Sequence, residues 1–188
     1  MTQVEDISEH LRFRPAVEED YPAIGSLVTS EEELFFVYPR GHYPFDVQQI
    51  RVLARERHEL TVAIVKGKVV GFTNLYDMEA KHQAFIGNVI IEKTLRGCGI
   101  GRKMIGVMLK FCFEKYRLPK VNISVFSHNI PALVLYSRLG FTPVELEERQ
   151  DFSGQKTVMI HMALPRKIYE DGTNKNSYGK IGEYHKGA

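Results

Sequence analysis

Two patterns of apolar and polar residues alternate along the chain, and each predicts a different kind of element. Short apolar, β-branched runs predict strands, whereas apolar residues that recur about every three or four positions predict helices. Strands are expected at residues 11–14, 60–65, 68–77, 85–91, 121–126, 144–150 and 157–164. Helices are expected from Pro22 onward and over residues 46–57, 101–116 and 132–139. The chain should therefore contain about seven strands and about four helices.

Turn signals between the expected strands predict how these strands pair. Lys66-Gly67 and the polar residues 79–82 join neighbouring strands closely, which predicts an antiparallel meander. Residues 151–154 close a further hairpin. The strand at 121–126 follows a helix, so we expect it to lie parallel to the strand before it. The predicted fold is a mixed, mostly antiparallel, twisted sheet with flanking helices, in the α/β (α+β) class.

The length of the chain predicts a single domain with short appendages. The 188 residues, 44% of them hydrophobic, are enough to build one ordinary core, which we expect within residues 11–164. Residues 1–10 show no apolar period and are expected to form a flexible lead-in, and the polar residues 165–188 a mobile tail. The aromatic, proline-broken residues 35–45 either pack against the core or wall a substrate cleft.

Charge, hydropathy and cysteine content exclude several classes of protein. The 25 Lys and Arg residues are nearly balanced by 23 Asp and Glu residues, which leaves no overall field for binding nucleic acid. No stretch approaches the roughly 18 to 20 apolar residues of a membrane span. Cys98 and Cys112 are the two cysteines, and we expect reduced thiols in a cytoplasmic protein. The sequence holds no H-E-x-x-H or C-x-x-C pair, so no metal site is expected.

The strongest chemical signal is the stretch AFIGNVIIEKTLRGCGIGRKMIG, residues 84–106. An expected strand there leads into Gly97, Gly99 and Gly101, which open an apolar helix. Closely spaced glycines at a helix start leave backbone N–H groups uncovered and allow positive φ, so the turn can wrap around an anion. The spacing fits neither the dinucleotide-binding G-x-G-x-x-G motif nor a Walker A loop. We interpret the turn as a cradle for a pyrophosphate.

A second motif lies one helix and one strand further along the chain. The segment HNIPALVLYSRLGF, residues 128–141, is similar through Asn129 and Tyr136 to the N-x-x-A-x-x-x-Y-x-x-x-G-F segment of the GCN5-related N-acetyltransferases. The turn RGCGIG, residues 96–101, resembles the R/Q-x-x-G-x-G/A signature of the same family. The resemblance covers roughly residues 11–164. It implies the GNAT fold, in which acetyl-coenzyme A binds where the two parallel central strands splay apart.

The resemblance also implies which residues bind acetyl-coenzyme A. Backbone groups of Val89, Ile90 and Ile91 would pair with the pantetheine arm, whose amides need partners once they are buried. Asn129 would contact the cofactor or cap its own helix. The amides and cations of the glycine turn would hold the pyrophosphate, through Arg96, Gly97, Cys98, Gly99, Ile100, Gly101 and Arg102.

The chemistry that the resemblance implies is direct transfer, in which a deprotonated amine attacks the thioester carbonyl and coenzyme A leaves as a thiol. Tyr136 matches the position of the family's general acid, and a backbone N–H near Ile90 or Ile91 would polarise the carbonyl. No base is identified, because Ser124 stands where members that acetylate ribosomal-protein N-termini often carry a carboxylate. Bases acting through water remain open among Glu33, Asp77, Glu79, His82 and His128.

Two functions of different classes remain open from the sequence. The first is an N-acetyltransferase that moves the acetyl group of acetyl-coenzyme A to a primary amine on a small molecule or a protein, without a nucleic-acid or membrane partner. The second is a non-catalytic module that binds acyl-coenzyme A as a sensor or regulator. Tyr136 favours the enzyme, and the missing carboxylate leaves room for the module. Formation of a homodimer is also left open.

Overall fold

The computed structural model describes residues 7, 9–171 and 184 of the chain, and its strands form one seven-stranded sheet. The strand order is β1-β2-β3-β4-β5-β7-β6. All neighbours are antiparallel except β4 and β5, which run parallel. The strands are β1 Leu11–Pro15, β2 His58–Val65, β3 Lys68–Glu79, β4 Gln83–Ile91, β5 Lys120–Phe126, β6 Thr142–Gln150 and β7 Lys156–Pro165. The predicted mixed sheet, with its meander and its parallel central pair, is confirmed.

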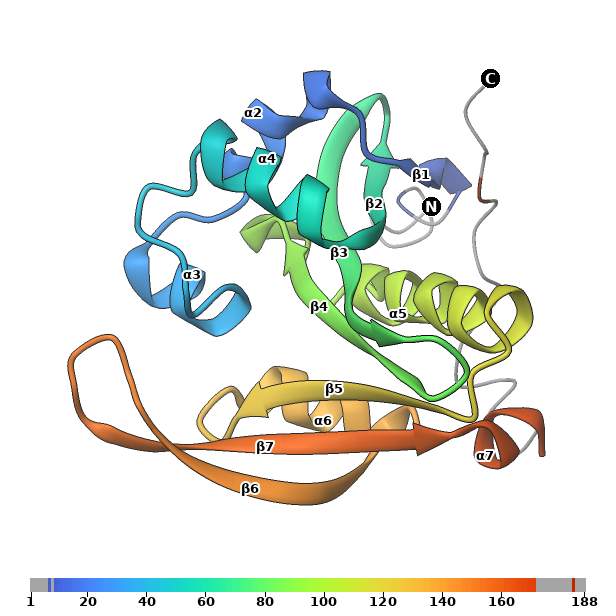
Figure 1. The fold of residues 1–188 in the computed structure, drawn as a ribbon. Coiled ribbons are helices and arrows are strands. Elements are labelled where there is room, and N and C mark those ends of the chain that lie inside the picture. The colour runs from blue at the N-terminus through green and yellow to red at the C-terminus, as the bar shows by residue number, and fades with distance from the viewer. Residues whose placement is uncertain (1–6, 8, 172–183, 185–188) are drawn as a thin grey trace.

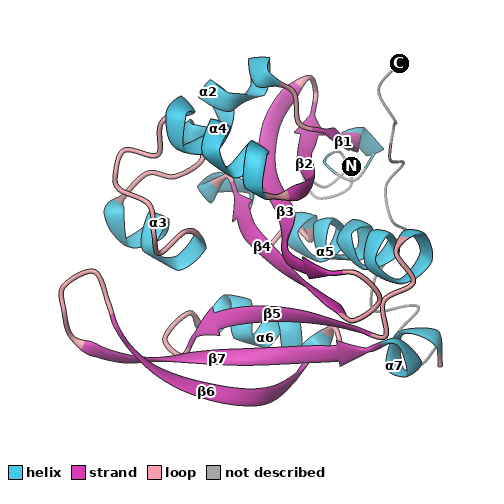
Figure 2. Ribbon diagram, in the orientation of Figure 1, coloured by secondary structure: helices cyan, strands magenta, loops and turns pink. Residues whose placement is uncertain are grey.

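Helices cover both faces of this sheet (Figures 1 and 2). On one face, Ile24, Leu34 and Ile50 of three short helices pack on Val62 and Phe72 of the sheet. On the opposite face, two helices later in the chain pack on the sheet in the larger core cluster. The helices are α2 Tyr21–Ser26, α3 Glu31–Val37, α4 Val47–Glu56, α5 Ile100–Lys110, α6 Ile130–Arg138 and α7 Arg166–Glu170. Within the described residues, no helix is long and apolar enough to cross a membrane.

The two parallel strands separate after a short stretch of pairing. β4 and β5 are paired only at Phe85–Asn122 and Ile86–Ile123. Beyond this point β4 stays paired with β3 through Ile91, and its backbone bulges at Asn88, which has a φ of 48°. Figure 1 shows the β1–β4 part and the β5–β7 part of the sheet diverging from this point. The splay between the parallel strands is therefore present, as expected.

Both ends of the domain differ in detail from the sequence prediction. Ile7, in the expected lead-in, is buried in the larger core cluster. Residues 166–170, expected in the tail, form α7, because Arg166 Nη2 donates to the Phe113 carbonyl at 2.7 Å and its Nε donates to the Leu118 carbonyl at 3.1 Å. These contacts join residues far apart in the sequence, so a local pattern does not reveal them. Residues 1–6, 8, 172–183 and 185–188 of the expected lead-in and tail lie outside the described residues.

Two further segments depart from the expected helix bounds. The helix predicted over residues 101–116 begins at Ile100 and changes after Lys110 into a π-helical turn, Phe111–Lys115. Residues 31–37, for which no helix was predicted, form helix α3, whose first turn is capped because the Ser30 side chain accepts from the Glu33 N–H. Both cysteines are free thiols, and burial raises the pKa of Cys112 to about 12.

An ion pair at the start of α2 makes the stability of the fold depend on pH. Asp20 accepts from Arg14 at 2.6 and 2.8 Å and from the Val17 N–H at 2.9 Å. Burial raises the pKa of Asp20, but these hydrogen bonds outweigh burial, and the net pKa is lowered. A lowered folded-state pKa means that the stabilisation is present at neutral pH and is lost as the pH falls through that pKa.

We expect Asp20→Asn to lower the free energy of unfolding by about 2 kcal/mol at neutral pH, since it leaves Arg14 without its anion. The deficit should shrink at about pH 3, below the ordinary aspartate pKa of about 3.9, because the unfolded wild-type chain takes up a proton there that the folded carboxyl binds less readily. Urea unfolding at both pH values measures it, with the exposed neighbour Glu19→Gln as the control. Equal stability of Asp20→Asn and wild type at neutral pH would contradict this account.

Candidate functional site

The glycine turn between β4 and α5 forms an open backbone cradle. Gly97 and Gly99 have φ angles of +82° and +83°, and a Cβ added at either would meet no heavy atom within 4 Å. Gly99 is the N-cap of α5, so the N–H groups of Ile100, Gly101 and Arg102 have no partner inside that helix. The turn therefore presents N–H groups and the positive end of a helix dipole to open space, which suits an anion such as a pyrophosphate.

The side chain of Arg96 ties this cradle to α3. Its Nε donates to the Ile91 carbonyl at 3.1 Å, and its Nη1 pairs with Glu33 Oε1 at 3.0 Å. Burial raises the pKa of Glu33, but hydrogen bonds from Thr29 and the charge of Arg96 outweigh it and lower the pKa. Glu33 is thus held ionised as the partner of a cation, which makes it a poor base. Arg96 remains 45% exposed and can still reach an anion in the cradle.

β4 leaves one backbone edge uncovered beside the cradle. Ile90 and Ile91 pair with Phe72 and Gly71 of β3, whereas the pairing of β4 with β5 ends at Ile86. The side chain of Ile90 is buried on the α2–α4 face, and those of Val89 and Ile91 pack against the α5 cluster. An extended ligand with amide groups could add to this edge as a further strand would.

The second sequence motif places Asn129 and Tyr136 on helix α6. Asn129 Oδ1 accepts from the Ala132 N–H at 3.4 Å and caps the helix. Tyr136 is 6% exposed, and no hydrogen bond joins its hydroxyl to another described residue. Burial raises the pKa of Tyr136, and the neighbouring phenol of Tyr76 adds to the rise. The Tyr136 hydroxyl therefore stays protonated and is available as a proton donor.

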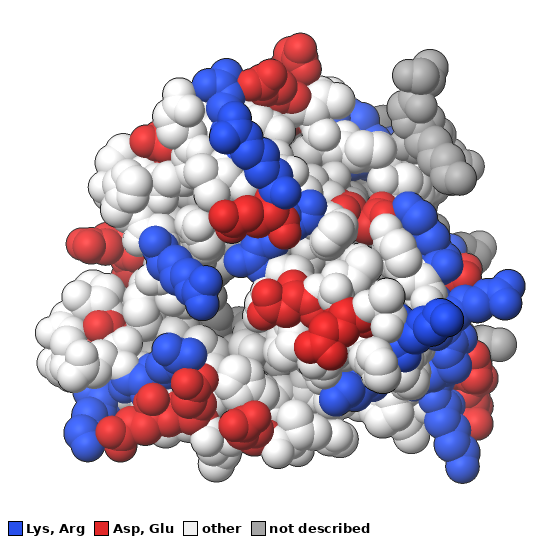
Figure 3. Space-filling model, in the orientation of Figure 1, with Lys and Arg blue, Asp and Glu red and all other residues white. Residues whose placement is uncertain are grey.

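A cluster of aromatic rings bridges α3, the end of β5 and the β6–β7 turn. Phe35 stacks on Phe126 at 4.5 Å between ring centroids and lies 6.1 Å from Phe152, while Phe36 lies 5.0 Å from His128. We call these five side chains the aromatic cluster. Figure 3 shows the molecule hollowed between the β1–β4 part and the β5–β7 part, with side chains of both charges around the rim. The structure thus places the start of residues 35–45, which were expected either to pack against the core or to wall a substrate cleft, beside the β6–β7 turn.

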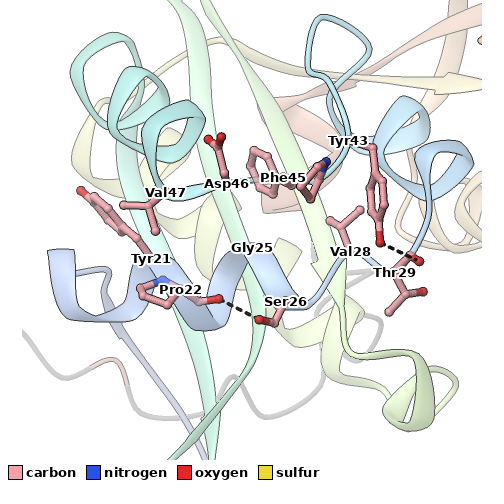
Figure 4. A pocket seen from close by; sticks show the side chains of 11 residues that line it. Tyr21, Pro22, Gly25, Ser26, Val28, Thr29, Tyr43, Phe45, Asp46 and Val47 are labelled. Atoms are coloured by element: carbon pink, nitrogen blue, oxygen red, sulfur yellow. Dashed lines mark hydrogen bonds between the residues drawn. The ribbon is translucent and has the colours of Figure 1, made fainter.

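One pocket lies away from the glycine turn and the aromatic cluster. A pocket of about 490 Å³ opens between α2 and residues 43–47, against Tyr21, Tyr43 and Asp46 (Figure 4). No residue of the glycine turn or of the aromatic cluster lines it. Residues 35–45 therefore divide between two places, because their first aromatic residues join the aromatic cluster and Tyr43 lines this pocket.

Most of the bases left open by the sequence are surface groups. Asp77, Glu79 and His82 are exposed around the β3–β4 turn. His128 is exposed and shares a hydrogen bond of 3.1 Å with the Thr157 hydroxyl. None of these four adjoins the glycine turn in a contact that the described residues show, and Glu33 is paired with Arg96.

Sequence reasoning missed two polar groups that line the diverging strands. In the first, Asn74 Nδ2 donates to Asn88 Oδ1 at 2.8 Å, and Asn88 Nδ2 donates to the Val37 carbonyl at 2.9 Å, which links the β4 bulge to α3. In the second, Ser124 Oγ lies 2.8 Å from His161 Nδ1. Asparagines inside an apolar strand were a usable signal for the first group. The second joins strands separated by a helix, so no local pattern reveals it.

Comparison with known proteins identifies the family. The model of the acetyltransferase (GNAT) family matches residues 25–141, which is more than half of the chain. This protein belongs to the GNAT family. The matched residues contain β4, the glycine turn and α6, and therefore every element of the site described above except β7 and the hairpin turn that precedes it.

Individual GNAT proteins resemble the chain at moderate identity. A probable spermine N(1)-acetyltransferase of Bacillus subtilis subsp. natto is 30% identical over 100 residues, which are 50% of this chain and 64% of that protein. A mutant of the spermidine N-acetyltransferase SpeG of Vibrio cholerae matches at a TM-score of 0.71 with 18% identity, over 87% of this chain and 98% of that one. A protein of Streptococcus mutans UA159, smu.2055, matches at a TM-score of 0.68 with 24% identity, over 81% and 98%. These structural matches bear on the fold alone.

Proposed function

We propose that this GNAT protein is an N-acetyltransferase that moves the acetyl group of acetyl-coenzyme A to a primary amine. The observation that carries the proposal is the open glycine cradle at the start of α5, beside the uncovered edge of β4. A pyrophosphate and an amide-containing arm need these two features side by side. The family match supports the same pairing of ligand and reaction.

In this proposal the cofactor is held mainly by backbone groups. The N–H groups of residues 97–102 bind the pyrophosphate, and Arg96 and Arg102 supply positive charge beside it. Residues 89–91 pair with the amides of the pantetheine arm. Asn129 acts chiefly through its cap on α6, which holds Tyr136 in place. The thioester then lies where β4 and β5 separate.

The transfer itself needs a polarised carbonyl and a protonated leaving group. A backbone N–H near Ile90 or Ile91 would accept the developing negative charge on the carbonyl oxygen. The nitrogen–carbon bond forms as the carbon–sulfur bond breaks, and Tyr136 donates its proton to the departing sulfur. Tyr136 suits this task because burial keeps its hydroxyl protonated and no described residue holds that hydroxyl in a hydrogen bond.

For the acceptor we propose an aliphatic amine that carries further positive charge, of the polyamine type. The aromatic cluster supports this choice, because the faces of aromatic rings attract ammonium groups and pack on alkyl chains. The named activity of the Bacillus relative, a probable spermine N(1)-acetyltransferase, points the same way. The chain spans only 64% of that relative, so its substrate enters here as a proposal.

Release of coenzyme A thiol with a panel of amines tests the function. We expect turnover with spermine, less with a free L-amino acid, and little with a peptide bearing a free N-terminus. Calorimetric titration of the same protein with acetyl-coenzyme A measures binding separately. Tight binding without thiol release on any amine would overturn the enzyme and favour the non-catalytic module.

The exposed ring of Phe152 provides a test of the acceptor side. Phe152 is 49% exposed, so Phe152→Ala should fold normally. Loss of a contact between its ring and an ammonium group is worth about 1 kcal/mol and should raise the KM for spermine about 5-fold, with the affinity for acetyl-coenzyme A unchanged. Ile168→Ala, which shortens an exposed apolar side chain on α7, is the control. An unchanged KM in Phe152→Ala would remove the aromatic cluster from the acceptor site.

A further inference from the structure

Ser124 stands at the point where the two parallel strands part. The last paired residues are Ile86 and Ile123, and Ser124 is the next residue of β5. Because side chains alternate along a strand, Ser124 shares a face with Phe126 of the aromatic cluster, while Ile123 points into the α5 core. The hydroxyl of Ser124 thus lies on the acceptor side, at the narrow end of the splay.

Directly across from Ser124 on β7 stands a histidine. The register of β5 and β7 pairs Ser124 with His161, and Ser124 Oγ lies 2.8 Å from His161 Nδ1. On the next strand, β6, Glu147 Oε2 lies 3.1 Å from His161 Nε2. Arg149 Nη2 contacts the other oxygen of Glu147 at 2.9 Å. A continuous polar chain therefore crosses three neighbouring strands.

The contacts along these polar side chains determine which atom donates and which accepts in each hydrogen bond. Hydrogen bonds from His161 and Arg149 hold the pKa of Glu147 below its usual range, so Glu147 is ionised and can only accept. Nε2 therefore carries the hydrogen when the His161 ring has a single N–H, and Nδ1 then has a free electron pair that accepts from the Ser124 hydroxyl. The remaining electron pairs of Ser124 Oγ are left to accept from other donors.

The same hydroxyl is linked to the thioester side of the site. Tyr76 of β3 pairs with Phe85 of β4. Burial raises the pKa of Tyr76, and the nearby Ser124 hydroxyl opposes that rise. Tyr76 in turn lies close enough to Tyr136 to raise the pKa of that phenol. Ser124 is therefore a neighbour of the region in which the proposed acid acts.

We propose that Ser124, His161 and Glu147 form the path that removes the proton from the acceptor amine, in place of the strand carboxylate that this chain lacks. The inference rests on the proposed acetyl transfer. Ser124 Oγ contacts the substrate ammonium, His161 takes up the proton, and Glu147 acts as a positioning residue that fixes the tautomer of the ring.

The proton leaves the ammonium group and reaches His161 in two linked steps through Ser124. The ammonium N–H bond breaks as a new O–H bond forms on Ser124, and the original O–H proton of Ser124 moves to His161 Nδ1. Ser124 ends neutral, His161 ends as an imidazolium paired with Glu147, and the amine is left with the electron pair that attacks the carbonyl carbon. His161 is 23% and Glu147 37% exposed, so the proton can pass on to water.

Replacement of the proton acceptor should produce a deficit that depends on pH. We expect His161→Gln to lower kcat at about pH 7 by about 100-fold, the size typical of a lost general base. The deficit should shrink to a few-fold at about pH 9.5, where about a tenth of an aliphatic amine with the ordinary pKa of about 10.4 is already deprotonated in water, far more than at pH 7. The groups that face His161 are Glu145 and Glu147 on β6 and Ser124 on β5, with Arg149 and Tyr76 behind them, and all are retained in this variant.

Two variants of Ser124 separate a chemical role from a structural one. Ser124→Ala should show a deficit similar to that of His161→Gln, whereas Ser124→Thr, which keeps the hydroxyl and suits a strand, should restore most of the activity. His58→Gln, at the exposed start of β2, is the histidine control. All variants should bind acetyl-coenzyme A with wild-type affinity, which calorimetric titration checks.

The outcomes distinguish the proton path from the proposed function. If the wild type acetylates spermine and His161→Gln follows the same pH profile within a few-fold, the path is overturned while the function stands. A deficit in His161→Gln that is equal at all pH values would also overturn it, since a distorted site loses activity regardless of the state of the amine. If the wild type releases no thiol with any amine, the proposed function fails and the path falls with it.

Discussion

Replacement of Gly99 with valine is expected to raise the Kd for acetyl-coenzyme A about 100-fold or more. Gly99 caps α5 at a φ of +83°, and the space around its Cα is open. A valine there fills the cradle and pushes an anion away from the N–H groups of the first turn. Loss of two charge-assisted hydrogen bonds at about 1.5 kcal/mol each corresponds to such a factor. Calorimetric titration with acetyl-coenzyme A measures it.

The chain offers a closely matched control for this substitution. Gly67, in the β2–β3 turn, has a φ of +78° and also meets no heavy atom within 4 Å of an added Cβ. Gly67→Val therefore carries the same backbone strain, about 1–3 kcal/mol, far from the proposed site. Both variants should lose similar stability, but only Gly99→Val should lose affinity. Equal, wild-type affinity in the two variants would show that the glycine turn does not hold the cofactor.

Removal of the Tyr136 hydroxyl is expected to lower kcat by about 100-fold and to leave the affinity for acetyl-coenzyme A unchanged. The hydroxyl would protonate the leaving sulfur, and general acids contribute a factor of about 100 to 10,000. No described residue shares a hydrogen bond with this hydroxyl, so Tyr136→Phe should cost little stability. Steady-state kinetics and calorimetric titration of the same preparation give the two numbers.

The pH dependence of this deficit distinguishes the acid from the base. Burial raises the pKa of Tyr136, so the wild-type phenol stays protonated up to that raised value and the deficit of Tyr136→Phe should be constant from about pH 7 to 9.5. The deficit of His161→Gln should instead shrink over the same range. Tyr21→Phe, which alters another buried phenol on α2, is the control. Unchanged turnover in Tyr136→Phe would remove Tyr136 as the acid.

The elements that local patterns predicted well are those whose apolar period is strong. The β2–β3–β4 meander and the β6–β7 hairpin follow from alternation and turn chemistry, and both appear within a few residues of their expected bounds. α7 was missed because its stability comes from Arg166, which reaches the carbonyls of Phe113 and Leu118. A short polar helix held by distant carbonyls has no period of its own.

The candidate site likewise contains one feature that depends on local sequence and one that depends on contacts between distant residues. The glycine cradle is a local feature, because three glycines at the start of one helix determine both φ and the exposure of N–H groups. The role of Ser124 could not be judged in this way. In the sequence, Ser124 is noticed only because it occupies a position where a carboxylate was sought. The chemistry proposed for it depends on His161, which faces Ser124 only because β7 returns antiparallel beside β5.

The sequence by itself therefore determined the order and type of most elements, the family and the open glycine turn, since each depends on residues close together in the chain. Tertiary structure decided where β4 leaves β5, how the aromatic rings of α3 meet Phe152, and which side chain stands beside Ser124. The physical reason is that register between strands distant in sequence is set by packing of the whole sheet, and a shift of one residue would turn His161 to the opposite face.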